Sequence, residues 1–205
     1  MTLTVAIASE NDSFDGEVYR VLLAQLLGVP VVRWVGSFAF NGYKSVAKVA
    51  PAFLLAAAAA GVEHALFAID NDGGASRNPE HEPSHVAPPF DLTDDRSCRE
   101  CWLQSALPNA WKEGTGRLGI VVPVQLIETW LLVLRGAPLE PTPEQASAYN
   151  RNALKKKFFG KTTPPLATRI ALAKAELEKP NALDLLEERP SFRRFAERVA
   201  AWRIA

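Results

Sequence analysis

Short apolar runs and longer amphipathic stretches alternate along the first 135 residues of the chain. An apolar run of four to eight residues predicts a buried strand, and apolar residues that recur every three or four positions predict a helix. The expected strands are residues 3–9, 31–35, 64–69 and 118–124, and the expected helices are residues 15–27, 43–60 and a segment that begins near Leu126. This alternation predicts an α/β fold, in which a mostly parallel four-stranded sheet is covered by helices on both faces.

The pattern changes at two places further along the chain. Residues 73–97 are rich in Pro, Asp, Glu, His and Gly and show little periodicity, which is uncommon for a loop of this length unless something orders it. Beyond Pro141 the chain becomes helical and more charged. We therefore expect an α/β domain over residues 1–140, in which residues 73–105 form an insertion, and a helical C-terminal extension over residues 141–205 that packs on this domain.

The composition of the chain limits which kinds of partner, such as nucleic acid or a membrane, it is expected to bind. The 205 residues include 23 Lys and Arg and 23 Asp and Glu, so any binding of nucleic acid must depend on a local basic patch. No apolar segment approaches the roughly 20 residues that span a bilayer, and no basic region precedes an apolar segment at the start of the chain. We expect a cytoplasmic protein that has no membrane partner and no structural disulfide between its two cysteines.

Acidic residues follow three of the expected strands. Glu10 comes after the first strand, Asp70 and Asp72 after the third, and Glu128 in the segment after the fourth. Because ligands of open α/β sheets gather at the carboxyl ends of the strands, we expect these carboxylates to lie together. Carboxylate oxygens are the ligands that Mg²⁺ prefers. The sequence therefore predicts a Mg²⁺ (or Mn²⁺) site made by Glu10, Asp70, Asp72 and Glu128.

An alternative is that Asp70-Asn71-Asp72 forms a surface turn and that Glu128 is an exposed helix position. Against it, carboxylates clustered without a cation repel one another, and one of them would be driven to take a proton. One or two Mg²⁺ ions would remove this penalty and could activate a water for phosphoryl displacement.

A second metal site is predicted inside the expected insertion. His81, His85, Cys98 and Cys101 are four of the five His and Cys residues of the chain. Two imidazoles and two thiolates make the tetrahedral set of a structural Zn²⁺ site, and zinc would supply the order that this segment otherwise lacks. The alternative is a Cys-x2-Cys pair beside two solvated histidines. We expect His64, at the start of a strand, to be an ordinary partly buried histidine.

The ordered set of acids resembles the TOPRIM pattern, in which a glutamate follows the first strand and Asp-x-Asp follows the third. That pattern occurs in topoisomerases, primases and the overcoming-lysogenization-defect (OLD) nucleases. The chain is more similar to small stand-alone prokaryotic TOPRIM-like proteins, which are often found near defence genes. Three further segments carry this similarity, namely Ile127-Glu128-Thr129-Trp130-Leu131-Leu132, the lysine-rich residues 154–161 and the spaced phenylalanines of residues 192–199.

The resemblance implies a Mg²⁺-dependent nuclease that cuts DNA or RNA in phage defence, with an ATPase as a possible partner protein. It also implies that Lys156 and Lys161 grip the phosphodiester backbone or neutralise charge in the transition state. A solvated basic face is the alternative for these lysines. The chain departs from the pattern at Asn11, where a glycine usually follows the first glutamate. Glu17, which follows Gly16, is therefore a second candidate, although placement at the end of a strand favours Glu10.

Two other functions remain open. One is another metal-dependent phosphoryl or nucleotidyl transferase. An example is a nucleotide-sugar enzyme that binds a diphosphate through Mn²⁺ at Asp-x-Asp, although the chain before Asp70 is short for a complete nucleotide-sugar domain. A non-catalytic, zinc-braced subunit could instead bind nucleic acid or a partner ATPase. Substituting Asp70 and Asp72 separates these possibilities, because an enzyme would lose turnover and a binding subunit would keep its binding function.

Overall fold

The computed structural model describes residues 1–11, 13–70, 99–107, 117–123, 126–137 and 151–202, and for residues 101, 102 and 151 the backbone alone. Contacts divide the chain into two compact units. The sheet unit comprises Met1–Ile69, Leu103–Val121 and Arg194–Ala205. The helical unit comprises Asp70–Trp102 and Val122–Arg193. The limits of these two units differ from the expected domain boundary at residue 140, and that boundary stays a prediction.

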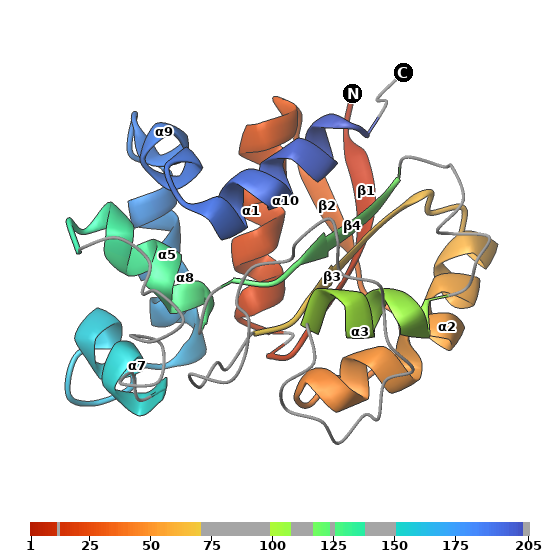
Figure 1. The fold of residues 1–205 in the computed structure, drawn as a ribbon, viewed down its shortest axis with the longest axis horizontal. Coiled ribbons are helices and arrows are strands. Elements are labelled where there is room, and N and C mark those ends of the chain that lie inside the picture. Colours follow the sequence, from red (N-terminus) through yellow and green to blue (C-terminus); the bar gives the residue numbers. More distant parts are fainter. Residues whose placement is uncertain (12, 71–98, 108–116, 124–125, 138–150, 203–205) are drawn as a thin grey trace. The chain divides into compact units, whose positions relative to one another are not determined.

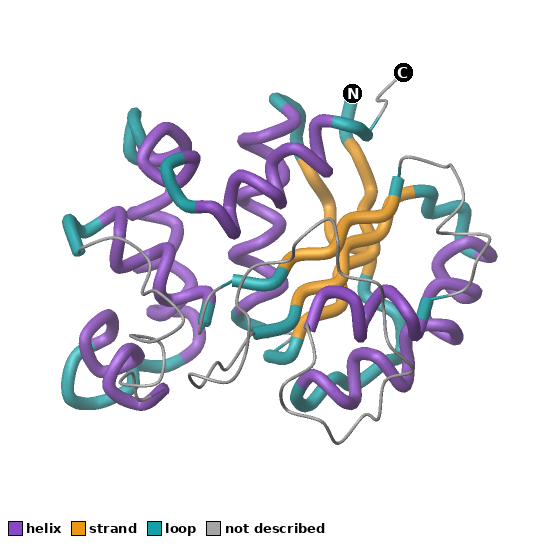
Figure 2. Tube along the Cα trace, viewed as in Figure 1, coloured by secondary structure: helices purple, strands orange, loops and turns teal. Residues whose placement is uncertain are grey.

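The sheet unit is built on four parallel strands (Figures 1 and 2). They are β1 (Leu3–Ser9), β2 (Val31–Trp34), β3 (His64–Ala68) and β4 (Leu118–Val121), in the order β2-β1-β3-β4. The expected parallel four-stranded sheet is confirmed, although β4 ends three residues before the expected position. Ser9 of β1 pairs with Ala68 of β3, and Ala68 pairs with Val121 of β4, so the three strands end level with one another.

Two helices of the sheet unit cover opposite faces of the sheet (Figure 1). Helix α1 (Asp15–Leu27) connects β1 to β2, and α2 (Tyr43–Ala59) connects β2 to β3. The two connections run in opposite directions across the sheet, so right-handed crossovers place the helices on opposite sides. Gly28 ends α1 with a φ of 66°, a left-handed conformation that a residue without Cβ adopts at little cost.

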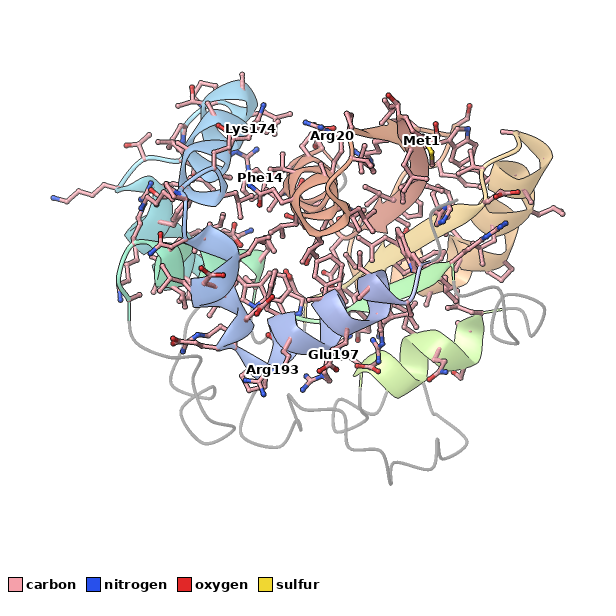
Figure 3. The ribbon with its side chains drawn as sticks, turned by 90° about the horizontal axis from the view of Figure 1, so that it is seen from above. Met1, Phe14, Arg20, Lys174, Arg193 and Glu197 are labelled. Carbon is pink, nitrogen blue, oxygen red and sulfur yellow. The ribbon has the colours of Figure 1, made fainter. Side chains whose placement is uncertain are left out.

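The last helix, α10 (Pro190–Ala200), belongs to the sheet unit from Arg194 onward. Phe195 packs edge-on against Tyr19 of α1, and the Arg198 guanidinium donates to the Ile120 carbonyl over 2.7 Å. The ring centroids of Trp202 and His64 are 5.2 Å apart. On the outer side of α10 lies the exposed Glu197 (Figure 3). The amphipathic pattern of this segment is therefore explained by packing in the core.

Helix α3 (Arg99–Ala106) was not expected from the sequence, because it lies in the stretch assigned to the insertion. Its residues Leu103 and Leu107, the latter just beyond its end, are 0% and 3% exposed and join the core of the sheet unit. The end of the expected insertion is thus part of the folded core.

The helical unit contains α5 (Ile127–Leu134), α7 (Arg151–Phe159), α8 (Leu166–Leu177) and α9 (Ala182–Glu187). All eight residues of α5 are buried, which makes it the central helix of this unit. Trp130 of α5 is fully buried, and its indole N–H donates to the Ser191 hydroxyl over 2.9 Å. The helical character expected beyond residue 141 is confirmed for residues 151–202.

Within the described part of the chain, no helix combines the length and the apolar character that crossing a membrane requires.

Candidate functional site

Two buried carboxylates follow neighbouring strands. Glu10, directly after β1, is 7% exposed, and Asp70, two residues after β3, is 6% exposed. Strands β1 and β3 are hydrogen-bonded neighbours that end at the paired residues Ser9 and Ala68. The topology therefore places both acids after the carboxyl ends of adjacent parallel strands, which is where open α/β sheets bind their ligands.

Glu128 lies in the first turn of α5, within the helical unit. It is 3% exposed, so the alternative that it is an exposed helix position is wrong. The cause is the position of α5, which leaves none of its eight residues exposed to solvent. A buried carboxylate needs a cation or hydrogen-bond donors, because removing its charge from water is costly.

Lys155 of α7 supplies such a cation, and the sequence analysis did not single it out. Its Nζ lies 4.0 Å from Glu128 Oε1. Leu154 and Phe158 are buried four residues apart and define the inner side of α7, and Lys155 shares the same side with the buried Phe159. This spacing of apolar residues was the signal that could have identified Lys155.

The other lysines of this segment are placed differently. Lys156, Lys157 and Lys161 are all exposed. Exposure is compatible with contact to a nucleic-acid backbone, so the assignment of Lys156 and Lys161 stays a prediction. Lys155 is nevertheless the lysine that the structure brings to a predicted acidic residue.

The turn between β1 and α1 carries further charged groups. The Asn11 N–H donates to Asp15 Oδ2 over 3.1 Å, and Asp15 is 7% exposed. The Arg33 guanidinium of β2 donates to the Ile7 carbonyl and passes so close to Gly16 that a Cβ there would lie 2.5 Å from Arg33 Cζ. A Cβ at position 16 would therefore require the Arg33 side chain to shift.

The same turn bears on the choice between Glu10 and Glu17. Glu17 Oε2 lies 2.9 Å from Arg20 Nε, one helical turn along α1, and the Glu17 side chain is 32% exposed. Glu17 is thus half-buried in a local ion pair, whereas Glu10 is buried at the end of a strand. These positions favour Glu10 as the acidic ligand.

Most of the expected zinc ligands lie outside the described residues. These are His81, His85 and Cys98, and Asp72 is outside them too, while Cys101 is described by its backbone position in α3 alone. Among the described residues, no group of three or more His, Cys, Asp and Glu side chains is arranged to hold a metal ion. The zinc site stays a prediction, because three of its four ligands lie outside the described residues. Within the same described part of the chain, the expected cluster of acids around Mg²⁺ is not found as such a group either, and it too stays a prediction.

His64, the remaining histidine, is a core residue. It is 6% exposed, and its ring packs against Trp202. Burial, reinforced by the charge of Arg117, lowers the pKa of His64 below its ordinary value, while Glu63 partly opposes this shift. A neutral imidazole packed in this way is structural, as the sequence indicated.

Comparison of the chain with protein-family models, with curated proteins and with solved structures found no match.

Proposed function

We propose that this protein is a Mg²⁺-dependent nuclease that hydrolyses phosphodiester bonds of DNA or RNA. One observation carries the proposal, namely the two buried carboxylates, Glu10 and Asp70, after the carboxyl ends of the neighbouring strands β1 and β3. The similarity of the ordered acids to the TOPRIM pattern supports the same class of reaction. It also supports a role in phage defence, with an ATPase as the partner protein.

The chain would bind the cation through few protein ligands. Mg²⁺ is commonly held by one or two carboxylates, retains several waters and takes substrate phosphate oxygens as its remaining ligands. A group of three or more protein ligands is therefore not required. Asp70, with Asp72 two residues further on, and Glu10 are the residues that we assign to this role, and Glu128 is the additional acid of the helical unit. When bound, the ion supplies an activated water and stabilises the leaving oxygen.

The decisive test is cleavage of a mixed panel of labelled DNA and RNA by the full chain, with Mg²⁺, with Mn²⁺ and with EDTA. We expect cleavage with either cation, none with EDTA, and a loss of at least 1000-fold in Asp70→Asn, about 4 kcal/mol of transition-state stabilisation. Glu17→Gln is the matched control, since it also removes one carboxylate charge but from a local ion pair with Arg20. An Asp70→Asn protein that cuts at the wild-type rate would end the nuclease proposal.

A second readout does not depend on an activating partner. Binding of Mn²⁺ by the full chain, measured by electron paramagnetic resonance, should weaken by at least tenfold in Asp70→Asn and stay unchanged in Glu17→Gln. The non-catalytic alternative makes the opposite prediction for function, because Asp70→Asn would then keep the binding of nucleic acid or of a partner protein. Unchanged Mn²⁺ binding in Asp70→Asn would remove the metal site from this position.

A further inference from the structure

The amino end of α5 has the properties of a site for an anion. Leu126 precedes this eight-residue helix in an extended conformation, and no side chain caps the helix through a hydrogen bond. The first N–H groups of a helix have no partners within it, and the helix dipole adds partial positive charge at that end. Oxygen atoms of phosphate groups are common ligands of such ends. A helix end alone is not specific, so two further side chains decide the matter.

The first is Thr129, in the opening turn of α5. Thr129 is 7% exposed, and its Oγ1 has no hydrogen-bond partner within the described part of the chain. In a helix each Cα–Cβ bond tilts toward the amino end, so the Thr129 hydroxyl lies over the opening turn. A buried hydroxyl without a partner is costly, and an incoming oxygen acceptor would remove that cost.

The second is Lys155, on the inner side of α7. Its Nζ is 4.0 Å from Glu128 Oε1, whereas a hydrogen-bonded ammonium and carboxylate approach to about 2.7–2.9 Å. At this distance the ammonium balances the charge of Glu128 without a direct hydrogen bond to it. Its side chain is 31% exposed, so Lys155 is partly accessible to solvent.

We propose that the amino end of α5 binds a phosphate group. The Thr129 hydroxyl and the N–H groups that precede Thr129 in α5 donate to the phosphate oxygens, and the Lys155 ammonium supplies the positive charge. The Thr129 N–H itself donates to the Leu126 carbonyl over 3.0 Å. Glu128 places one negative charge at the same position, and Lys155 together with the positive helix end compensates it. As the site of a substrate phosphate this inference rests on the proposed nuclease function, and it specifies which residues hold the phosphate.

The test uses inorganic phosphate as the probe and the full chain in EDTA at constant ionic strength. The melting temperature and the affinity from an NMR chemical-shift titration are measured for the wild type, Thr129→Val, Lys155→Met and Lys157→Met. Lys157 is the matched control, because it is an exposed lysine two positions along the same helix. We expect phosphate to raise the wild-type melting temperature. Affinity should fall about 10- to 100-fold in Lys155→Met, about 3- to 10-fold in Thr129→Val and less than twofold in Lys157→Met.

Thr129→Val also separates a binding role from a folding defect. Valine has the shape of threonine without the hydroxyl, so without phosphate this variant should melt at a temperature equal to or higher than that of the wild type. A protein that is more stable yet binds phosphate more weakly cannot owe its loss of affinity to misfolding.

Three results would overturn the inference. They are a wild-type protein that does not respond to phosphate, equal losses in Lys155→Met and Lys157→Met, and an unchanged affinity in Thr129→Val. Cleavage with Mg²⁺ is measured in parallel. Phosphate binding with the expected variant effects but without cleavage would remove the nuclease and leave the phosphate site. Cleavage without those variant effects would remove the phosphate site and leave the nuclease.

Discussion

The two ends of α5 differ in how closely the charged side chains beside them are paired. At the carboxyl end Arg135 contacts Glu176 of α8 at 2.7 Å, and Lys179 contacts the same carboxylate. Arg135 also donates to the Phe158 carbonyl and lies over the Phe158 ring, 4.0 Å from its centroid. Lys179 in turn donates to the Leu134 carbonyl over 2.9 Å. The carboxyl end is a closed network that joins α5, α7 and α8.

The ion pair described at the amino end of the same helix is longer. Glu128 has Lys155 at 4.0 Å, the helix has no side-chain cap, and the Thr129 hydroxyl lacks a partner within the described residues. A network of hydrogen-bonded ion pairs holds helices together, whereas a cation that makes no direct hydrogen bond to its carboxylate can also contact a ligand. Burial of a carboxylate therefore does not by itself identify a functional site. The two ends differ in the length of the ion pair, which is 4.0 Å from Lys155 to Glu128 and 2.7 Å from Arg135 to Glu176.

The largest expected effect is on cleavage when the carboxylate beside one end of α5, Glu128 or Glu176, is replaced by an amide. Glu128→Gln should reduce cleavage by at least 1000-fold, about 4 kcal/mol, because it removes an acid that we assign to the catalytic site. Glu176→Gln should leave the cleavage rate within about threefold at a temperature where it is folded. Rates measured at 20 °C for both variants check this. A larger loss of activity in Glu176→Gln than in Glu128→Gln would reverse the comparison.

A second prediction concerns the predicted zinc site, in which four protein ligands would leave no coordination position open. Cys98→Ser should release about one zinc per chain and lower the free energy of unfolding by several kcal/mol, because the energy of metal binding is folding energy in such sites. Metal analysis and chemical denaturation measure the two quantities. Gently purified protein that contains no zinc would contradict the site.

A third prediction concerns the stability of the closed end. Glu176→Gln should lower the free energy of unfolding by about 1–3 kcal/mol, because two cations lose their shared carboxylate. Burial raises the pKa of Glu176, but hydrogen bonds from Lys179 and Arg135 outweigh it and hold the pKa below the ordinary 4.5. The stabilisation is therefore full above pH 4.5 and is lost as pH falls through the lowered pKa. Urea denaturation between pH 7 and pH 3 should show a shallower acid limb in the variant.

The smallest expected effect is that of His64 on the pH dependence of stability. It occurs at higher pH than the effect of Glu176, so the two can be measured separately. Because the pKa of His64 is lowered from 6.5, the unfolded chain takes up the proton first as pH falls. Stability should therefore decrease from pH 6.5 downward, before Glu176 begins to titrate. His64→Phe keeps a ring against Trp202 and should flatten the stability curve between pH 7 and pH 5. An unchanged curve in this range would show that another group titrates there.

The local pattern of the sequence was sufficient to predict β1, α1, β2, α2 and β3 of the sheet unit. Strand β1 and helix α1 were expected with the bounds that the structure shows, and β2, β3 and α2 differ by one residue at one end. Their apolar spacing reports directly which side chains face a core. The parallel topology then followed from the helical connections, and with it the position of Glu10 and Asp70 after their strands.

Only the tertiary structure decided which charges meet. Four lysines within seven residues look alike in the sequence, and packing of Leu154 and Phe158 turns Lys155 toward Glu128. The partners Arg135 and Glu176 are separated by 41 positions, and no local pattern connects them. Helix α3 was missed for the same reason, since long-range burial of Leu103 and of Leu107 just beyond its end, rather than a strong local periodicity, holds it in the core. Local periodicity fixes the elements, whereas contacts between distant residues determine the charge environment of each site.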